Sequence, residues 1–136
     1  MNALKHSFKK RERLKSKKEI ASVFSAGKSI SKGGVRFIYN TEQKDSTEAK
    51  SLLKTALAVP KKKIKKAVDR NLLKRRMKEA FRTNNSGLKT IATNLNVKIN
   101  LMIVYQSDEI ALYTEIGDKI ILLLQRLETI VKKQNA

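Results

Sequence analysis

The sequence predicts an α+β fold, a two-layer α/β sandwich of order α-β-β-β-α-β-α in which helices cover one face of a small sheet. Residues 97–105 (VKINLMIVY) form a long, mostly apolar run that is typical of a buried strand. Residues 66–83 and a segment starting near Thr114 carry apolar side chains at helical spacing. The length of 136 residues is usual for one domain, so we expect 1–136 to form a single domain.

The first helix is predicted to start at a capping box. Ser16 and Glu19, three positions apart, can each satisfy a backbone donor of the other. Gly27 is the expected end of this helix, and residues 1–15 before it are expected to be mobile. Three residues at helical spacing form its apolar side: Ile20, Val23 and Phe24.

Two segments between the first helix and the basic helix are expected to supply strands. Residues 28–40 end in the strand-like VRFIYN, and their Gly33-Gly34 pair indicates a bulge or kink. Residues 52–59 are apolar enough for a buried strand and are followed by Pro60, which cannot extend a ladder of hydrogen bonds.

Two polar segments predict loops, at residues 41–51 and at residues 84–96. The helix that starts near Thr114 follows the strand 97–105. Its apolar face is predicted to contain Ile116, Ile120, Leu123, Leu124, Leu127, Ile130 and Val131.

The charge of the chain indicates a polyanionic partner. The sequence has 31 Lys+Arg and 12 Asp+Glu, a formal net charge of +19. Such a surplus favours binding to nucleic acid without deciding the fold. Residues 5–36 and 61–82 each hold eleven cations and two acids, and both keep an apolar helical stripe. We therefore expect the charge to be displayed on folded structure.

The helix 66–83 separates its charges from its apolar residues. On a helical projection, an apolar side contains Leu73, Met77, Ala80 and Phe81, and a different side contains Asn71, Lys74, Arg75, Lys78 and Arg82. Like charges at i,i+4 repel one another unless a polyanion meets them, and RNA is the natural candidate. An ordinary solvated helix face is the alternative, but such faces usually mix both signs of charge.

The sequence offers no residues for catalysis by the protein itself. The sole histidine, His6, lies in the N-terminal segment, and there is no cysteine for a thiolate metal site or a disulfide. The acids form no carboxylate cluster of the kind that a protein-based nuclease needs. No apolar run approaches the roughly 18 residues that cross a bilayer, and no secretory signal is present. A cytoplasmic protein, monomeric when free, is the expectation.

Three aromatic residues, Phe24, Phe37 and Tyr39, fit either a core or a surface that stacks on single-stranded RNA. Phe37 and Tyr39 share one strand face because side chains repeat every two residues. The residues alone leave both alternatives open.

Residues 67–75 (AVDRNLLKR) resemble the signature helix of the bacterial ribonuclease P protein subunit, whose pattern runs roughly A-V-x-R-N-R-x-K-R. Residues 59–63 (VPKKK) are similar to the basic turn that precedes it in the family. Arg13-Leu14, Phe24 and Gly27 resemble its N-terminal pattern. The resemblance covers about residues 11–39 and 52–82, and the order of the remaining elements agrees with it.

The resemblance implies a small mixed sheet with a left-handed β-α-β crossover, against the right-handed default. It also implies a function. The family's protein joins a large catalytic RNA, and the holoenzyme removes the 5′ leader of precursor tRNA. The RNA and its Mg²⁺ ions carry out the hydrolysis, so Mg²⁺ is the implied cofactor, held mainly by RNA, and the protein supplies no catalytic residue.

Two sets of site residues follow from the resemblance. The set implied to contact the catalytic RNA subunit is Arg70, Asn71, Lys74, Arg75, Lys78 and Arg82. The set implied to hold the leader of precursor tRNA, in a cleft between the first helix and the sheet, is Ile20, Phe24, Tyr39, Lys61 and Lys62. Leu72 departs from the pattern where a second arginine is expected, and Arg76 is a candidate substitute. Ile20 stands where the family commonly has phenylalanine.

Two other function classes share some of these features. A ribosomal or ribosome-assembly protein would have similar charge, although such proteins often extend a basic tail into rRNA and the last helix here is nearly neutral. A DNA-binding module would need a short recognition helix with base-reading residues and often a dimer seam, and neither is evident. A single co-purified structured RNA of a few hundred nucleotides would favour the ribonuclease P reading.

Overall fold

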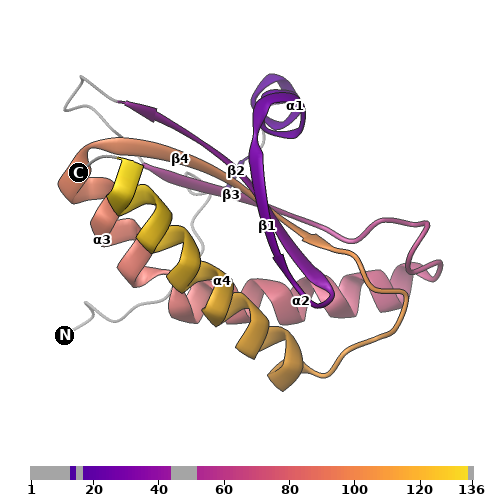
Figure 1. Ribbon diagram of the computed structural model, residues 1–136. Coiled ribbons are helices and arrows are strands. Elements are labelled where there is room, and N and C mark those ends of the chain that lie inside the picture. Colours follow the sequence, from indigo (N-terminus) through magenta and orange to yellow (C-terminus); the bar gives the residue numbers. More distant parts are fainter. Residues whose placement is uncertain (1–12, 15–16, 44–51, 135–136) are drawn as a thin grey trace.

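The computed structural model describes residues 13–14, 17–43 and 52–134 (Figure 1). The helices in this part of the chain are α1 (Lys17–Ala26), α2 (Ala67–Asn84), α3 (Ser86–Leu95) and α4 (Tyr113–Gln134). The strands are β1 (Lys28–Lys32), β2 (Val35–Gln43), β3 (Leu53–Ala58) and β4 (Val97–Tyr105). They form one mixed sheet in the order β1-β2-β4-β3, with only the β3–β4 pair parallel. The predicted α+β class is confirmed.

The register of the sheet assigns each strand residue to one of two faces. Tyr39 lies opposite Leu101, and Asn40 lies opposite Asn100, which is flanked on its other side by Lys54. Successive side chains of a strand point to opposite faces. Tyr39 and Leu101 therefore share one face of the sheet, whereas Asn40, Asn100 and Lys54 share the other.

The main core lies between the first of these faces and three helices, α2, α3 and α4. The predicted apolar stripe of α2 is fully buried there, as Leu73, Met77, Ala80 and Phe81. α4 buries all but one of its predicted apolar residues, and Ile130 is half-buried at the margin. The helical periodicity therefore identified the core side of both long helices.

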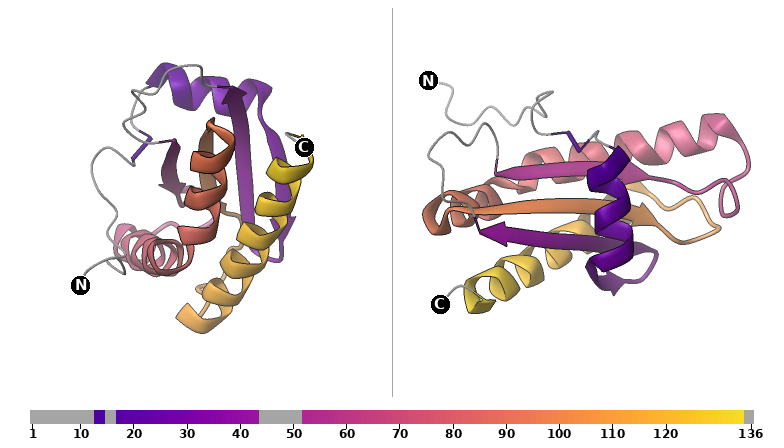
Figure 2. Two further views of the ribbon diagram at one scale, coloured as in Figure 1. Left: turned by 90° about the vertical axis from the view of Figure 1, so that its left-hand side faces the viewer. Right: turned by 90° about the horizontal axis from the view of Figure 1, so that it is seen from above.

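The first helix lies on the opposite face of the sheet, alone among the described helices (Figures 1 and 2). Its Val23 is fully buried against Ile38 of β2 and Met102 of β4. Gly27 follows the helix, as predicted, and its N–H donates to the carbonyl of Val23 at 2.8 Å. A Cβ at Gly27 would come within 2.2 Å of that carbonyl. The prediction that the helices cover one face is therefore wrong for α1, which adds a partial third layer.

The segment 84–96, predicted to be a loop, contains the helix α3. The run Asn84-Asn85-Ser86-Gly87 suggested a loop, but the apolar residues Leu88, Ile91 and Ala92 follow helical spacing and are buried. Their burial between α4 and β4 outweighs the weak helix propensity of the polar residues. Asn96 ends α3 in the left-handed conformation, with φ 53°, and turns the chain into β4.

Two further sequence predictions need correction between residues 28 and 43. Gly33-Gly34 is the two-residue turn of the β1–β2 hairpin, with Lys32 paired to Val35, instead of a bulge inside one strand. Gly33 adopts φ 58°, which a glycine reaches without strain. Residues 41–43, predicted to start a loop, continue β2. The rest of the predicted loop, 44–51, lies outside the described residues.

The end of the N-terminal segment is fixed against the sheet. Arg13 bridges to Thr55 of β3, the Leu14 N–H donates to the Thr55 carbonyl at 2.9 Å, and the Leu14 side chain is buried. The expected mobility of residues 1–15 is therefore wrong at Arg13 and Leu14. Residues 1–12 and 15–16, including the Ser16 half of the predicted capping box, lie outside the described residues.

Candidate nucleic-acid interface

The exposed side of α2 carries the basic face predicted from the sequence. Asn71, Lys74 and Arg75 are exposed, whereas Lys78 and Arg82 are half-buried. The acidic Glu79 lies beside them and forms an ion pair with Arg82, whose Nη2 is 2.5 Å from Oε2. This contact lowers the pKa of Glu79, chiefly through the hydrogen bond from Arg82. The one acid within this face is thus neutralised, and the other cations set its charge.

Arg70 has a structural task in addition to its predicted contact with RNA. Its guanidinium donates to the carbonyl of Ile64 at 3.0 Å and to the carbonyl of Lys65 at 2.7 Å. These carbonyls lie just before α2, in the segment that links β3 to the helix. Arg70 therefore fixes the basic turn against the start of α2, so part of its hydrogen-bonding capacity is already used.

Arg76 is also engaged within the protein. Its Nη1 donates to the carbonyl of Ala111 at 2.5 Å, which ties α2 to the segment before α4. Arg76 was the candidate substitute for the arginine missing at Leu72. Because one of its donors is used within the protein, Arg76 is less available than the exposed Lys74 and Arg75 to replace the arginine missing at Leu72.

Two of the residues predicted to hold a leader lie on one flank of α1. Ile20 is half-buried. The small apolar floor of the sheet on this side consists of Ala56, Ala58 and Val104, which, like Ile20, pack against the buried cluster around Val23. Phe24 follows one turn later and leaves 54% of its surface exposed. An exposed phenylalanine beside an apolar floor can stack on a nucleobase without disturbing the core.

Tyr39 does not belong to this cleft. Its side chain is 4% exposed in the main core, on the face of the sheet opposite α1. Burial raises the pKa of its hydroxyl. The prediction that Tyr39 faces Phe24 is therefore wrong, and its neighbours Ile38 and Asn40 face α1 instead. The core alternative holds for Phe37 as well, which is fully buried.

Lys61 and Lys62 are exposed in the turn that follows Pro60. They follow the C-terminal end of β3. At this end of the sheet Ala58 of β3 lies beside Val104 of β4, which lies beside Arg36 of β2. The helical spacing of α1 directs Ile20 and Phe24 toward this end of the sheet. The two lysines and the flank with Phe24 thus border the same apolar floor.

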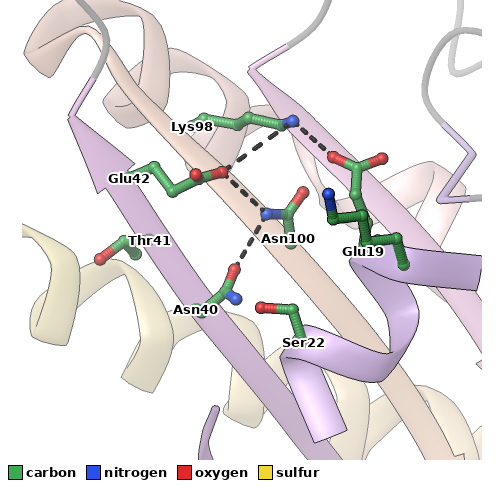
Figure 3. A pocket seen from close by; sticks show the side chains of 8 residues that line it. Glu19, Ser22, Asn40, Thr41, Glu42, Lys98 and Asn100 are labelled. Carbon is green, nitrogen blue, oxygen red and sulfur yellow. Dashed lines mark hydrogen bonds and ion pairs between the residues drawn. The ribbon is translucent and has the colours of Figure 1, made fainter. Parts of the chain in front are cut away.

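The other flank of α1 borders a polar groove of about 420 Å³, which the sequence did not reveal (Figure 3). Its central charge is Lys98, whose Nζ is 2.6 Å from Glu19 and 4.0 Å from Glu42. Lys54 is 3.9 Å from Glu19. The acids and lysines nearly balance, so this groove is far less cationic than α2.

Asn100 forms the floor of the polar groove and is 3% exposed. Its Nδ2 donates to Asn40 at 2.9 Å and to Glu42 at 3.3 Å, whereas its Oδ1 is buried without a hydrogen bond within the protein. Buried acceptors are usually satisfied. Lys98 and Asn100 are polar and stand at alternate positions of an otherwise apolar strand. This pattern could have predicted a polar site on one face of β4.

Within residues 13–14, 17–43 and 52–134, no group of three or more His, Asp or Glu side chains could hold a metal ion. Over the same residues, no helix combines the length and the apolar character needed to span a membrane.

Comparison with known proteins identifies relatives with one common description. The family model Ribonuclease P matches residues 8–128. The ribonuclease P protein component of Chlorobium phaeobacteroides is 34% identical over 86 residues, which are 63% of this chain and 59% of that protein. The component from Porphyromonas gingivalis is 31% identical over 101 residues, 74% of this chain and 72% of that protein. The chain thus spans less than two thirds of the Chlorobium relative.

Solved structures with the same fold carry the same description. The RNase P protein of Staphylococcus aureus superposes with a TM-score of 0.64 at 18% identity, covering 85% of this chain and 94% of that one. The RNase P protein of Thermotoga maritima gives a TM-score of 0.64 at 21% identity, covering 85% and 96%. At this identity the structures show the fold alone, whereas the family-model match over residues 8–128 shows the family. The chain belongs to the ribonuclease P protein family.

Proposed function

We propose that this chain is the protein subunit of ribonuclease P, an endoribonuclease, and that it works in the cytoplasm. It joins the catalytic RNA and assists removal of the 5′ leader from precursor tRNA. The observation that carries this proposal is the exposed basic face of α2 on a chain whose residues 8–128 match the family. The partner is RNA because a face of exposed cations attracts an anionic phosphate backbone.

The RNA subunit binds the basic face of α2. Lys74 and Arg75 are its most accessible cations, and Asn71 beside them can donate to phosphate or sugar oxygens. Lys78 and Arg82 extend the face toward the end of the helix. Arg70 supports this contact from the start of α2, where it also braces the basic turn.

The leader of precursor tRNA runs along the face of the sheet that α1 crosses. Lys61 and Lys62 hold its phosphates, while Phe24 stacks on a base and Ile20 supplies an apolar contact. Beyond α1, the near-neutral polar groove suits bases better than phosphates, because Glu19 and Glu42 offset its lysines.

Mg²⁺ is held mainly by RNA, and the hydrolysis takes place on the RNA subunit. The test is reconstitution of the full chain with a transcript of the ribonuclease P RNA from the same genome. Cleavage at the mature 5′ end should require less Mg²⁺ with the protein than without it, because the cations of α2 offset phosphate repulsion. An unchanged Mg²⁺ requirement would contradict the proposal.

The protein without RNA should leave precursor tRNA intact. This expectation follows because the described residues include no group that could hold a catalytic metal ion. The measurement is gel analysis of labelled precursor tRNA after incubation in Mg²⁺ with nuclease-treated, RNA-free protein. Cleavage that persists in this protein and co-elutes with it would refute the assignment of the chemistry to RNA.

Phe24→Ala should weaken binding of leader-bearing precursor tRNA to the reconstituted complex by roughly 5- to 150-fold, the range for one stacked base. Because Phe24 is 54% exposed, the melting temperature should change little. Binding of mature tRNA, which has no leader, serves as the internal control. If both ligands lose affinity equally, Phe24 does not contact the leader.

A further inference from the structure

A second surface feature lies beside the basic face of α2, away from α1. The helices α2 and α4 pack together (Figure 1). A shallow pocket of about 410 Å³ opens between α2 and the first turn of α4. It is lined by Leu72, Arg75, Arg76, Glu79 and Tyr113. The four residues from α2 recur at i, i+3, i+4 and i+7, so they form one stripe of the helix that borders its cations.

The walls of this pocket are largely apolar although charged residues surround it. Leu72 is half-buried, and Tyr113 leaves 41% of its surface exposed. An exposed apolar patch of this kind, rimmed by charge, is typical of a binding surface.

The segment that precedes Tyr113 is fixed by hydrogen bonds from two sides. The hydroxyl of Tyr105 accepts from the Ala111 N–H at 3.1 Å and donates to the carbonyl of Glu109. From the other side, Arg76 donates to the Ala111 carbonyl. These contacts fix the backbone at Ala111, two residues before Tyr113, so the start of α4 is held against α2.

The charge around the pocket selects the occupant. The carboxylate of Glu79 is neutralised by Arg82, and Arg75 projects from the same stripe as an exposed cation. A protein partner would have to bury or neutralise the exposed guanidinium of Arg75. A nucleotide matches both features at once, because its base is an apolar planar surface and its phosphate is an anion.

We propose that this pocket takes an unpaired nucleobase of the RNA that binds α2. The base stacks on the ring of Tyr113 and contacts Leu72, while the guanidinium of Arg75 holds the adjoining phosphate. This inference rests on the proposed function, since it extends the RNA contact of α2 by one unstacked nucleotide. It also gives Leu72 a role, because an apolar side chain suits a base where a cation would suit a phosphate.

The first experiment measures affinity of the full chain for a transcript of its ribonuclease P RNA. Tyr113→Ala should weaken binding by roughly 5- to 150-fold, with an unchanged slope of log K against log salt because no phosphate contact is lost. Tyr113→Phe keeps the ring and should bind like the unmodified chain. Leu112→Ala, at an exposed neighbour that does not line the pocket, is the matched control and should also bind normally.

The second experiment reads the contact directly. The chain contains no tryptophan, so Tyr113→Trp creates a single fluorescent reporter. Its emission should be quenched when the RNA is added, because a stacked base quenches indole. The emission of Leu112→Trp should change much less.

The results separate this inference from the proposed function. If Lys74→Ala weakens RNA binding but Tyr113→Ala does not, the RNA contact of α2 stands and the nucleobase pocket is refuted. If Tyr113→Phe loses as much affinity as Tyr113→Ala, the hydroxyl acts instead of the ring and the stacking proposal is wrong. A protein dimer in sedimentation that Tyr113→Ala abolishes would assign the pocket to a second copy and overturn the proposal.

Discussion

Replacing Lys74 and Arg75 together by alanine should weaken binding of the RNA subunit by roughly a hundredfold. Each side chain is expected to make one charge-assisted contact with a phosphate, worth about 1.5 kcal/mol, and the losses should roughly add. The slope of log K against log salt should become shallower by about two, because two fewer counterions are released. The measurement is a filter-binding titration at several salt concentrations.

Lys132→Ala/Lys133→Ala is the matched control for this double variant. It removes the same net charge from exposed positions at the end of α4, far along the chain from α2. If the effect of the α2 variant comes from net charge alone, the control should show an equal loss. The melting temperature of both variants should stay near that of the unmodified protein, because Lys74 and Arg75 are exposed. Unchanged affinity and salt slope in the α2 variant would refute the assignment of this face to RNA.

Tyr39→Ala should destabilise the protein by about 3 kcal/mol and lower its melting temperature by about 10 °C. The cause is a cavity in the main core, where the ring is 4% exposed and packs on the side of α2 and α4. At a temperature where the variant is folded, its preference for leader-bearing over mature tRNA should be unchanged, because Tyr39 does not reach the α1 side of the sheet. Thermal denaturation and the two binding constants check this.

Asn40→Ala tests the other face of the same strand. Asn40 is half-exposed in the polar groove and accepts a hydrogen bond from Asn100. Its loss should cost only about 1 kcal/mol of stability, yet it should reduce the preference for leader-bearing tRNA. The opposite pattern, with Tyr39→Ala reducing the preference and Asn40→Ala leaving it unchanged, would contradict the assignment of the two faces.

The long, strongly periodic segments were predictable because their patterns reflect burial directly. The run 97–105 is β4 with the predicted bounds, and the apolar stripe of 66–83 is the buried side of α2. Once that side is buried, helix geometry leaves Lys74 and Arg75 facing solvent. The basic face therefore followed from the sequence.

The errors arose where a local pattern had two interpretations. Segment 84–96 combines polar loop formers with three apolar residues, and only packing against α4 and β4 makes it the helix α3. Along β2, alternation showed that Phe37 and Tyr39 share a face, but which face lies on the helices is set by the strand's neighbours. A shift of one residue moves a side chain to the other side of the sheet. Asn40 therefore lies in the polar groove beside α1, whereas Tyr39 lies in the main core.

The sequence by itself determined the charge, the two long helices with their buried sides, the central strand and the family to which the chain belongs. These properties depend on residue type and on spacing within one segment. The tertiary structure decided which face of the sheet α1 crosses, which lysines Glu19 and Glu42 neutralise, and that Leu72 and Tyr113 line one pocket. Those features join residues that are far apart in the chain, and their contacts exist only after the sheet and helices have packed.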